Sequence, residues 1–194
     1  MEYVYHFTSR EGWEGIRASG VLNPNTPNEL YNPEDCAKLG IILSPRLRSI
    51  MKDESYFVAI PELNHSGWQE YQLLDDLKFE ARKGVVLKVP VINRKGAFIR
   101  EHAHFSPKKF LDKFGIDLMH SEKICLEVIE NGRVLDRRFI DAVNEYYEST
   151  TALVDYKGDF KVPEIWIPQK TPLDKLEVVV NNTQVQEELT ALSC

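Results

Sequence analysis

Two residues, His6 and Glu164, carry ionisable side chains in segments that otherwise look like apolar or aromatic strands. His6 lies within the alternating segment 3–8, and Glu164 interrupts the apolar segment 162–167. A carboxylate in such a strand has to be solvated, paired or used in chemistry, because an unpaired buried charge costs several kcal/mol. Each residue alone is more typical of a structural role, so a catalytic interpretation has to come from the sequence around them.

A second group of candidates is cationic. Arg46, Arg48 and Lys52 follow one another closely, and a guanidinium fork suits the oxygens of a pyrophosphate. The alternative is a solvated surface turn, because Pro45 opens this segment as the first residue of a short helix. Arg46 is therefore a candidate phosphate ligand.

His102 and His104 are two residues apart, which puts both imidazoles on one side of an extended segment, as in half of a metal site. No carboxylate or thiolate at matched spacing completes such a site. We therefore expect residues 101–104 to form an exposed loop that binds no metal.

The three cysteines, Cys36, Cys125 and Cys194, are an odd number without CxxC spacing, so neither a disulfide framework nor a zinc ribbon is encoded. The chain opens without a basic and apolar leader, and nowhere do about 18 apolar residues run together. We expect a cytoplasmic protein without a membrane partner, although export by a route that ignores signal peptides would leave the same sequence.

Hydrophobic periodicity and turn signals predict the elements that must position these residues. Residues 3–8 predict a strand that feeds a helix at once, through a capping box of Thr8 and Glu11, and Gly20 ends that helix. Further strands are predicted at 40–44, 56–60, 85–89, 124–129, 133–135, 162–167 and 176–180, with 85–89 in the centre of a sheet. Helices are predicted at 45–50, 68–77, 106–115 and 138–148.

The 194 residues are 43% hydrophobic and 10% aromatic, which fits one compact domain and excludes a disordered chain. Strands and helices do not alternate regularly, which favours an α+β fold. We expect one domain over residues 1–180 and a flexible tail over 181–194. With 24 Lys and Arg against 30 Asp and Glu the net charge is −6, so a nucleic-acid substrate would need a local basic patch.

Several segments together resemble one superfamily. They are residues 5–9 (Tyr-His-Phe-Thr-Ser), 13–22, 43–46 (Leu-Ser-Pro-Arg), 163–168 and 171–176. The first two look like the opening of the ADP-ribosyltransferase superfamily, where a strand ending in His and Thr feeds a helix that closes on Gly and an apolar pair. The last two are similar to its late strand with the catalytic glutamate. The segment 43–46 resembles the bacterial DNA-targeting ADP-ribosyltransferase toxins.

The resemblance implies a split β-sandwich of two small sheets around an NAD cleft, with flanking helices. His6 would hold a ribose hydroxyl, with Thr8 beside it, and Glu164 would bond to the 2′-hydroxyl of the nicotinamide ribose. A carboxylate there stabilises the oxocarbenium-like cation that forms as nicotinamide leaves. The implied activity is mono-ADP-ribosyl transfer from NAD to a macromolecule, either a protein or a nucleic acid, as in a toxin or effector.

The chain departs from the histidine class of this superfamily on the second strand, where an aromatic residue usually stacks on nicotinamide. Residues 41–44 offer no aromatic side chain. Tyr56 or Phe57, or else Tyr31, is expected to take that place, because nicotinamide is planar and stacks on aromatic rings. Alternatively, Ser44 plays the part of the serine found in the arginine class.

Two other functions stay open beside this one. An NAD-dependent RNA 2′-phosphotransferase has the same fold, but its chemistry needs several basic phosphate ligands, and a net charge of −6 argues against it. A catalytically inactive member of the fold would bind only a nucleotide or a protein. Val162 stands two residues before Glu164, where transferases that modify arginine carry an acid or an amide, so arginine is not favoured as the acceptor.

Overall fold

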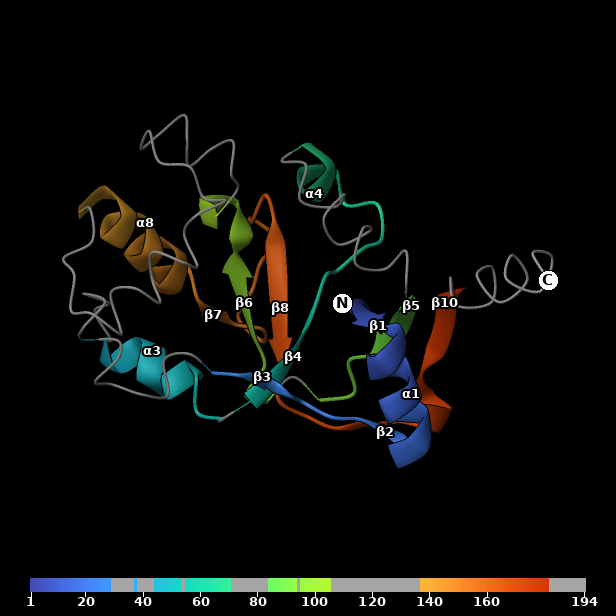
Figure 1. Ribbon diagram of the computed structural model, residues 1–194. Coiled ribbons are helices and arrows are strands. Elements are labelled where there is room, and N and C mark those ends of the chain that lie inside the picture. The colour runs from blue at the N-terminus through green and yellow to red at the C-terminus, as the bar shows by residue number, and fades with distance from the viewer. Residues whose placement is uncertain are drawn as a thin grey trace.

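The computed structural model describes residues 1–28, 37, 44–53, 55–70, 84–93, 95–105 and 137–181 (Figure 1). In this part of the chain the strands form three antiparallel sheets, with helices beside them. This arrangement confirms the α+β class predicted from the sequence. Within the described ranges, no helix has the length and apolar composition needed to cross a membrane.

The three-stranded sheet has β5 (Gly84–Pro90) in its centre, between β1 (Tyr3–Ser9) and β10 (Glu177–Asn181). The Val and Leu side chains of β5 are at most 3% exposed, which explains why a continuous apolar run predicted a central strand. In this sheet His6 lies opposite Leu87.

The five-stranded sheet has β8 in its centre. Its strand order is β3 (Thr26–Pro27), β4 (Ser55–Ala59), β8 (Pro163–Ile167), β6 (Phe98–Glu101) and β7 (Thr151–Ala152). Every residue of β8 is buried. The sequence did not predict β6, because four residues that end in Arg and Glu show no clear strand pattern. The third sheet pairs β2 (Val21–Leu22) with β9 (Thr171–Pro172).

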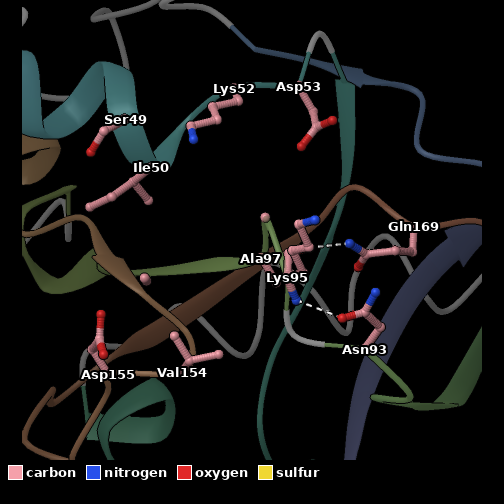
Figure 2. A pocket seen from close by; sticks show the side chains of 12 residues that line it. Ser49, Ile50, Lys52, Asp53, Asn93, Lys95, Ala97, Val154, Asp155 and Gln169 are labelled. Atoms are coloured by element: carbon pink, nitrogen blue, oxygen red, sulfur yellow. Dashed lines mark hydrogen bonds between the residues drawn. The ribbon is translucent and has the colours of Figure 1, made fainter.

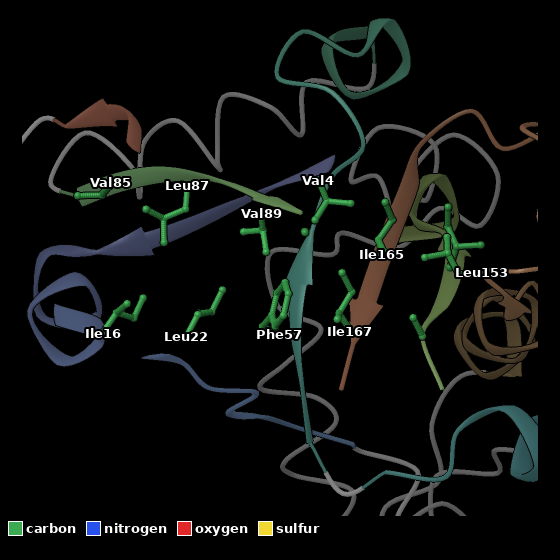
Figure 3. Close-up of a cluster of buried hydrophobic side chains, with 13 residues drawn as sticks. Val4, Ile16, Leu22, Phe57, Val85, Leu87, Val89, Leu153, Ile165 and Ile167 are labelled. Atoms are coloured by element: carbon green, nitrogen blue, oxygen red, sulfur yellow. The ribbon is translucent and has the colours of Figure 1, made fainter. Parts of the chain in front are cut away.

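The two larger sheets meet where β1 contacts the residue after β4. Tyr5 and Ile60 exchange two backbone hydrogen bonds, with N···O distances of 2.8 and 2.9 Å. Apolar side chains from both sheets and from the segment 16–22 form one core cluster. Among its members are Val4, Ile16, Leu22, Phe57, Leu87, Ile165 and Ile167 (Figure 3).

The helix α1 (Arg10–Ser19) follows β1 directly, as predicted. Its N-cap is Ser9, whose hydroxyl accepts a hydrogen bond from the Gly12 N–H at 3.1 Å, so the prediction of a cap at Thr8 is wrong by one residue. The Thr8 hydroxyl lies close to Gly12 instead, where an added Cβ would meet its Oγ1. Gly20 ends the helix with φ of 73°, a left-handed conformation that glycine adopts without strain.

The other helical elements are α3 (Pro45–Ile50), α4 (Ser66–Glu70), the 3₁₀ helix η2 (His102–Phe105), α8 (Arg137–Glu148) and the 3₁₀ helix η4 (Leu173–Lys175). The predictions of α3 and α8 are confirmed. The prediction of an extended segment over 101–104 is wrong, because only Glu101 belongs to a strand and the next residues turn into η2.

Several predicted features lie outside the described residues. These are most of the strand 40–44, the end of the helix 68–77, the helix 106–115, the strands 124–129 and 133–135, Tyr31, the three cysteines and residues 182–194. The strand β10 extends to Asn181, the first residue of the predicted tail.

Candidate active site

Hydrogen-bond donors enclose the Glu164 carboxylate on β8. The Tyr146 hydroxyl and the Trp166 indole N–H donate to Oε2, at 2.6 and 2.8 Å. The Nδ1 atom of His102 lies 3.2 Å from Oε1. The Glu164 side chain is 10% exposed and that of His102 is 24% exposed, so the imidazole forms the more open side of the group. The sequence required this carboxylate to be solvated, paired or used in chemistry, and the structure shows that it is paired.

These neighbours hold Glu164 in its charged form. Burial opposes ionisation, but the charge of His102 and the hydrogen bonds from its neighbours outweigh burial and lower the pKa of Glu164 from 4.5 to about 2. Burial and the nearby Glu164 charge raise the pKa of Tyr146 well above its ordinary value, so its hydroxyl remains a donor. A charged and oriented carboxylate can stabilise a cation that develops beside it.

Arg100 on β6 lies opposite Glu164 and is 2% exposed. Its Nε donates to the Thr150 hydroxyl at 3.1 Å, and its Nη1 donates to the Tyr146 hydroxyl at 3.4 Å. Its guanidinium carbon also lies 4.7–5.0 Å from the ring centres of Phe98, Tyr146, Tyr147 and Trp166. Tyr146 therefore links a buried cation to a buried anion, which offsets part of the cost of desolvating both.

The two histidines of η2 each face a carboxylate. His102 faces Glu164 on one side, and the Trp68 ring stacks on it with ring centres 5.2 Å apart. The Nδ1 atom of His104 lies 3.4 Å from Oε2 of Glu145. Both imidazoles are less than a quarter exposed, so the prediction of an exposed loop is wrong. In the described part of the chain, no three His, Cys, Asp or Glu side chains gather as metal ligands.

His6 lies in a different environment from Glu164. Its Nδ1 is 2.7 Å from the carbonyl oxygen of Val58, and its ring contacts that of Phe57 edge-on, with centres 5.6 Å apart. Burial lowers the pKa of His6, although the hydrogen bond to Val58 opposes this effect. The imidazole therefore helps to hold β1 against β4.

Strand alternation places His6 and Glu164 on opposite faces. Ile165 and Ala59 pair across β8 and β4, and both belong to the core cluster. Successive side chains of a strand point to opposite faces, so Glu164 points away from that core. His6 contacts Phe57 of the same core and points toward it. The structure therefore does not bring together the predicted pair in one cleft.

The β1 residues on the face of Glu164 are Tyr5 and Phe7. Tyr5 is the bridge partner of Ile60, and both Tyr5 and Phe7 pack against a second apolar cluster that contains Ile60 and Trp68. Because Trp68 stacks on the imidazole beside Glu164, these aromatic side chains border the site.

The candidates at the start of α3 have structural partners. Arg46 donates to the carbonyl oxygens of Glu148 and of Thr150, the latter at 2.7 Å, and its Nη2 lies 3.2 Å from the Glu148 carboxylate. These contacts tie α3 to the end of α8, where helix carbonyls lack intrahelical donors. The Ser44 hydroxyl accepts a hydrogen bond from the Leu47 N–H at 3.3 Å and caps α3.

The two described aromatic candidates for nicotinamide lie on opposite faces of β4. Tyr56 and Phe57 are both fully buried. Tyr56 contacts Trp166 edge-on, with ring centres 6.0 Å apart, and so lies on the Glu164 face. Phe57 lies in the core cluster. The third candidate, Tyr31, is outside the described residues.

Sequence reasoning missed Arg100, Tyr146 and Trp68 as neighbours of the Glu164 group. One signal was present, because Arg100 directly follows the apolar residues 97–99 and a buried cation needs an anion. Tyr146 shares the apolar face of α8, which is typical of packing alone. Nothing in the sequence around Tyr146 indicates that its hydroxyl donates to a residue on β8.

Comparisons of the chain with protein-family models, with curated proteins and with solved structures find no match. No relative therefore shows a function for this chain. Its function has to be argued from the side chains around Glu164.

Proposed function

We propose that the chain is an NAD-dependent mono-ADP-ribosyltransferase in which Glu164 is the catalytic carboxylate. The observation that carries the proposal is the state of this residue, a buried strand carboxylate with a pKa of about 2 that three side chains hold in place. The resemblance of residues 5–9 and 163–176 to that superfamily supports it. The two larger sheets, joined at Tyr5 and Ile60, fit a split β-sandwich.

In this reaction the bond between the nicotinamide nitrogen and ribose C1′ breaks, and nicotinamide leaves as a neutral molecule with the electron pair. The positive charge moves onto the ribose, where the Glu164 carboxylate stabilises it more strongly in the transition state than in the ground state. A nucleophile of the acceptor then bonds to C1′ and loses a proton. The acceptor is a protein or a nucleic acid, and the reaction uses no metal.

Within this proposal, the positioning residues differ from those expected from the sequence. Tyr146 and Trp166 orient the carboxylate, because both donate to the same oxygen. Tyr5 and Phe7 replace His6 as the β1 residues nearest to the ligand, since they share the face of the carboxylate. His6 is a residue that holds β1 against β4.

The phosphates of NAD need partners other than Ser44 and Arg46, because the Ser44 hydroxyl caps α3 and the Arg46 guanidinium binds the end of α8, whereas Thr8 stays a candidate. Arg46 is bound to Glu148 at the end of α8. This contact also argues against an RNA 2′-phosphotransferase, because that chemistry needs several cationic side chains that are free to bind phosphate.

A second candidate function is nucleotide or protein binding without catalysis. It is favoured by the contacts of Glu164, since both carboxylate oxygens have partners inside the protein. In that case Glu164 balances the buried Arg100 and stabilises the fold. Removing its charge would then change stability and leave ligand binding as it is.

The test measures nicotinamide release and transfer of label from labelled NAD, in chelator, with and without a cell lysate. We expect the wild-type protein to label the protein or the nucleic-acid fraction. Glu164→Gln keeps the volume of the side chain and removes its charge, so nicotinamide release should fall about 100-fold or more per folded molecule. NAD should still raise the melting temperature of this variant.

Two control variants separate catalysis from stability. Tyr146→Phe removes one donor and destabilises the same group but leaves the carboxylate, so its activity should exceed that of Glu164→Gln at equal folded fraction. Glu70→Gln makes the same chemical change at an exposed position and should behave as wild type. Full activity of folded Glu164→Gln would overturn the catalytic assignment. An NAD-induced thermal shift without nicotinamide release by the wild type would favour the binding function.

A further inference from the structure

A cavity of about 830 Å³ is lined by the residues drawn in Figure 2. It lies near the end of β8, whereas Glu164 is near the start of that strand. The end of α3, the residues before β4, the turn before β6, the turn after β7 and the residue Gln169 after β8 form its walls. Its volume is within the range of pockets that hold small molecules.

The side chains that face the cavity are of mixed chemistry. Figure 2 shows Ile50 and Val154 on one side and Lys95 and Gln169 on the other, with Lys52 extending toward the space between them. Among the described residues, neither lysine has a carboxylate within ion-pair distance. The cavity therefore presents two apolar side chains, two ammonium groups without a paired carboxylate in the described part of the chain, and the carboxylates of Asp53 and Asp155.

Gln169 has a polar atom without a partner at this cavity. Its amide nitrogen donates to the carbonyl oxygen of Lys95, and this bond fixes the orientation of the side-chain amide. Its Oε1 is buried and has no hydrogen-bond partner within the described structure. A buried acceptor without a donor costs free energy, so a ligand that brings an N–H or O–H group is favoured here.

The turn between Lys95 and Ala97 packs closely against Asp53, which precedes β4. Gly96 has φ of +76°, and an added Cβ would meet the Asp53 Oδ2 at 2.9 Å. The Lys95 N–H donates to the Asn93 side-chain oxygen at 2.9 Å, and this hydrogen bond stabilises the turn. The carboxylate of Asp53 thus lies against Gly96 of this turn.

We infer that this cavity binds a nucleoside monophosphate. The ammonium groups of Lys52 and Lys95 bind the phosphate, and the Asp53 carboxylate accepts from ribose hydroxyls. The apolar side chains Ile50 and Val154 pack on the base. A single ligand of this class supplies an anion, hydroxyl donors and a flat apolar surface together.

The cavity is separate from the proposed active site. Glu164 is near the start of β8, and Gln169 follows its end, so five residue steps separate them, which span up to about 16 Å at the rise of a strand. The inference therefore stands whether or not the chain transfers ADP-ribose.

The test is calorimetric titration of the full chain with AMP, GMP, CMP and UMP, and separately with adenosine, ribose 5-phosphate and inorganic phosphate. We expect at least one nucleoside monophosphate to bind about tenfold more tightly than its phosphate and sugar-phosphate fragments and than the nucleoside. Glu164→Gln should bind it with unchanged affinity, which separates this site from the proposed active site.

Three variants locate the binding. Lys52→Gln with Lys95→Gln should weaken it about tenfold or more, whereas Lys157→Gln, an exposed lysine outside the cavity, should leave it unchanged. Val154→Asp, at a position that is 62% exposed, should weaken it by replacing one of the two apolar contacts with a charge that repels the phosphate. The inference is overturned if no monophosphate binds, if inorganic phosphate binds as tightly, or if the double lysine variant keeps the wild-type affinity.

Discussion

The pH dependence of stability offers a direct test of the Glu164 contacts. In the folded chain the pKa of this carboxyl is about 2, against 4.5 as its ordinary value. At 1.36 kcal/mol per pKa unit the difference corresponds to about 3 kcal/mol of folding free energy. Because the unfolded chain binds this proton more tightly, the contribution is complete above about pH 4.5 and is lost as pH falls through about 2.

Glu164→Gln removes this contribution at neutral pH. We expect the free energy of unfolding to fall by about 3 kcal/mol near pH 7, which lowers the melting temperature by about 6–12 °C in a chain of this size. The gap between wild type and variant should narrow steadily between about pH 4.5 and 2. Other carboxyl groups titrate in the same range, but they are common to both proteins and cancel in the difference.

Urea unfolding, followed by tryptophan fluorescence at several pH values, measures this difference. Trp166 donates to the Glu164 carboxylate and should report the transition. Glu70→Gln, at an exposed position, is the matched control and should track the wild type at every pH. A gap between wild type and Glu164→Gln that stays constant from neutral pH to about pH 3 would refute the charged, paired state of this residue.

Four further substitutions test other parts of the structure. Arg100→Met should cost about 3–5 kcal/mol in urea unfolding, because the buried hydroxyls of Thr150 and Tyr146 lose hydrogen bonds from a charged donor, and a loss below about 1 kcal/mol would contradict that role. Because burial lowers the pKa of His6, the unfolded chain binds this proton more tightly, so stability should fall as pH drops below about 6.5. His6→Gln should flatten that slope, and an unchanged slope would show the imidazole to be solvated. Gly20→Ala should destabilise by about 1 kcal/mol, whereas Gly15→Ala, with open space around it, should stabilise by about 0.5–1 kcal/mol in thermal unfolding. Equal effects of the two changes would argue against the left-handed cap.

Local interactions explain the parts of the fold that the sequence alone predicts. The alternation of residues 3–8 predicts β1, the apolar run 85–89 predicts the central strand β5, and Gly20 ends α1. These features depend on side chains within a few positions of one another, so their signals are readable in the chain. The shift of the α1 cap from Thr8 to Ser9 is an error of a single residue within such a signal.

The partners of the ionisable residues were decided by tertiary structure. The sequence showed that Glu164 needs a partner, but Tyr146, His102 and Arg100 come from three other elements, α8, η2 and β6, which are 18 or more residues away in the chain. The sequence also did not determine whether His6 faces the core, because a strand pattern separates two faces without showing which one meets the neighbouring sheet. The backbone bridge of Tyr5 to Ile60 made that choice, and it turned His6 toward the core and away from Glu164. Such pairings depend on long loops closing and on the packing of whole sheets, and no short stretch of sequence carries that information.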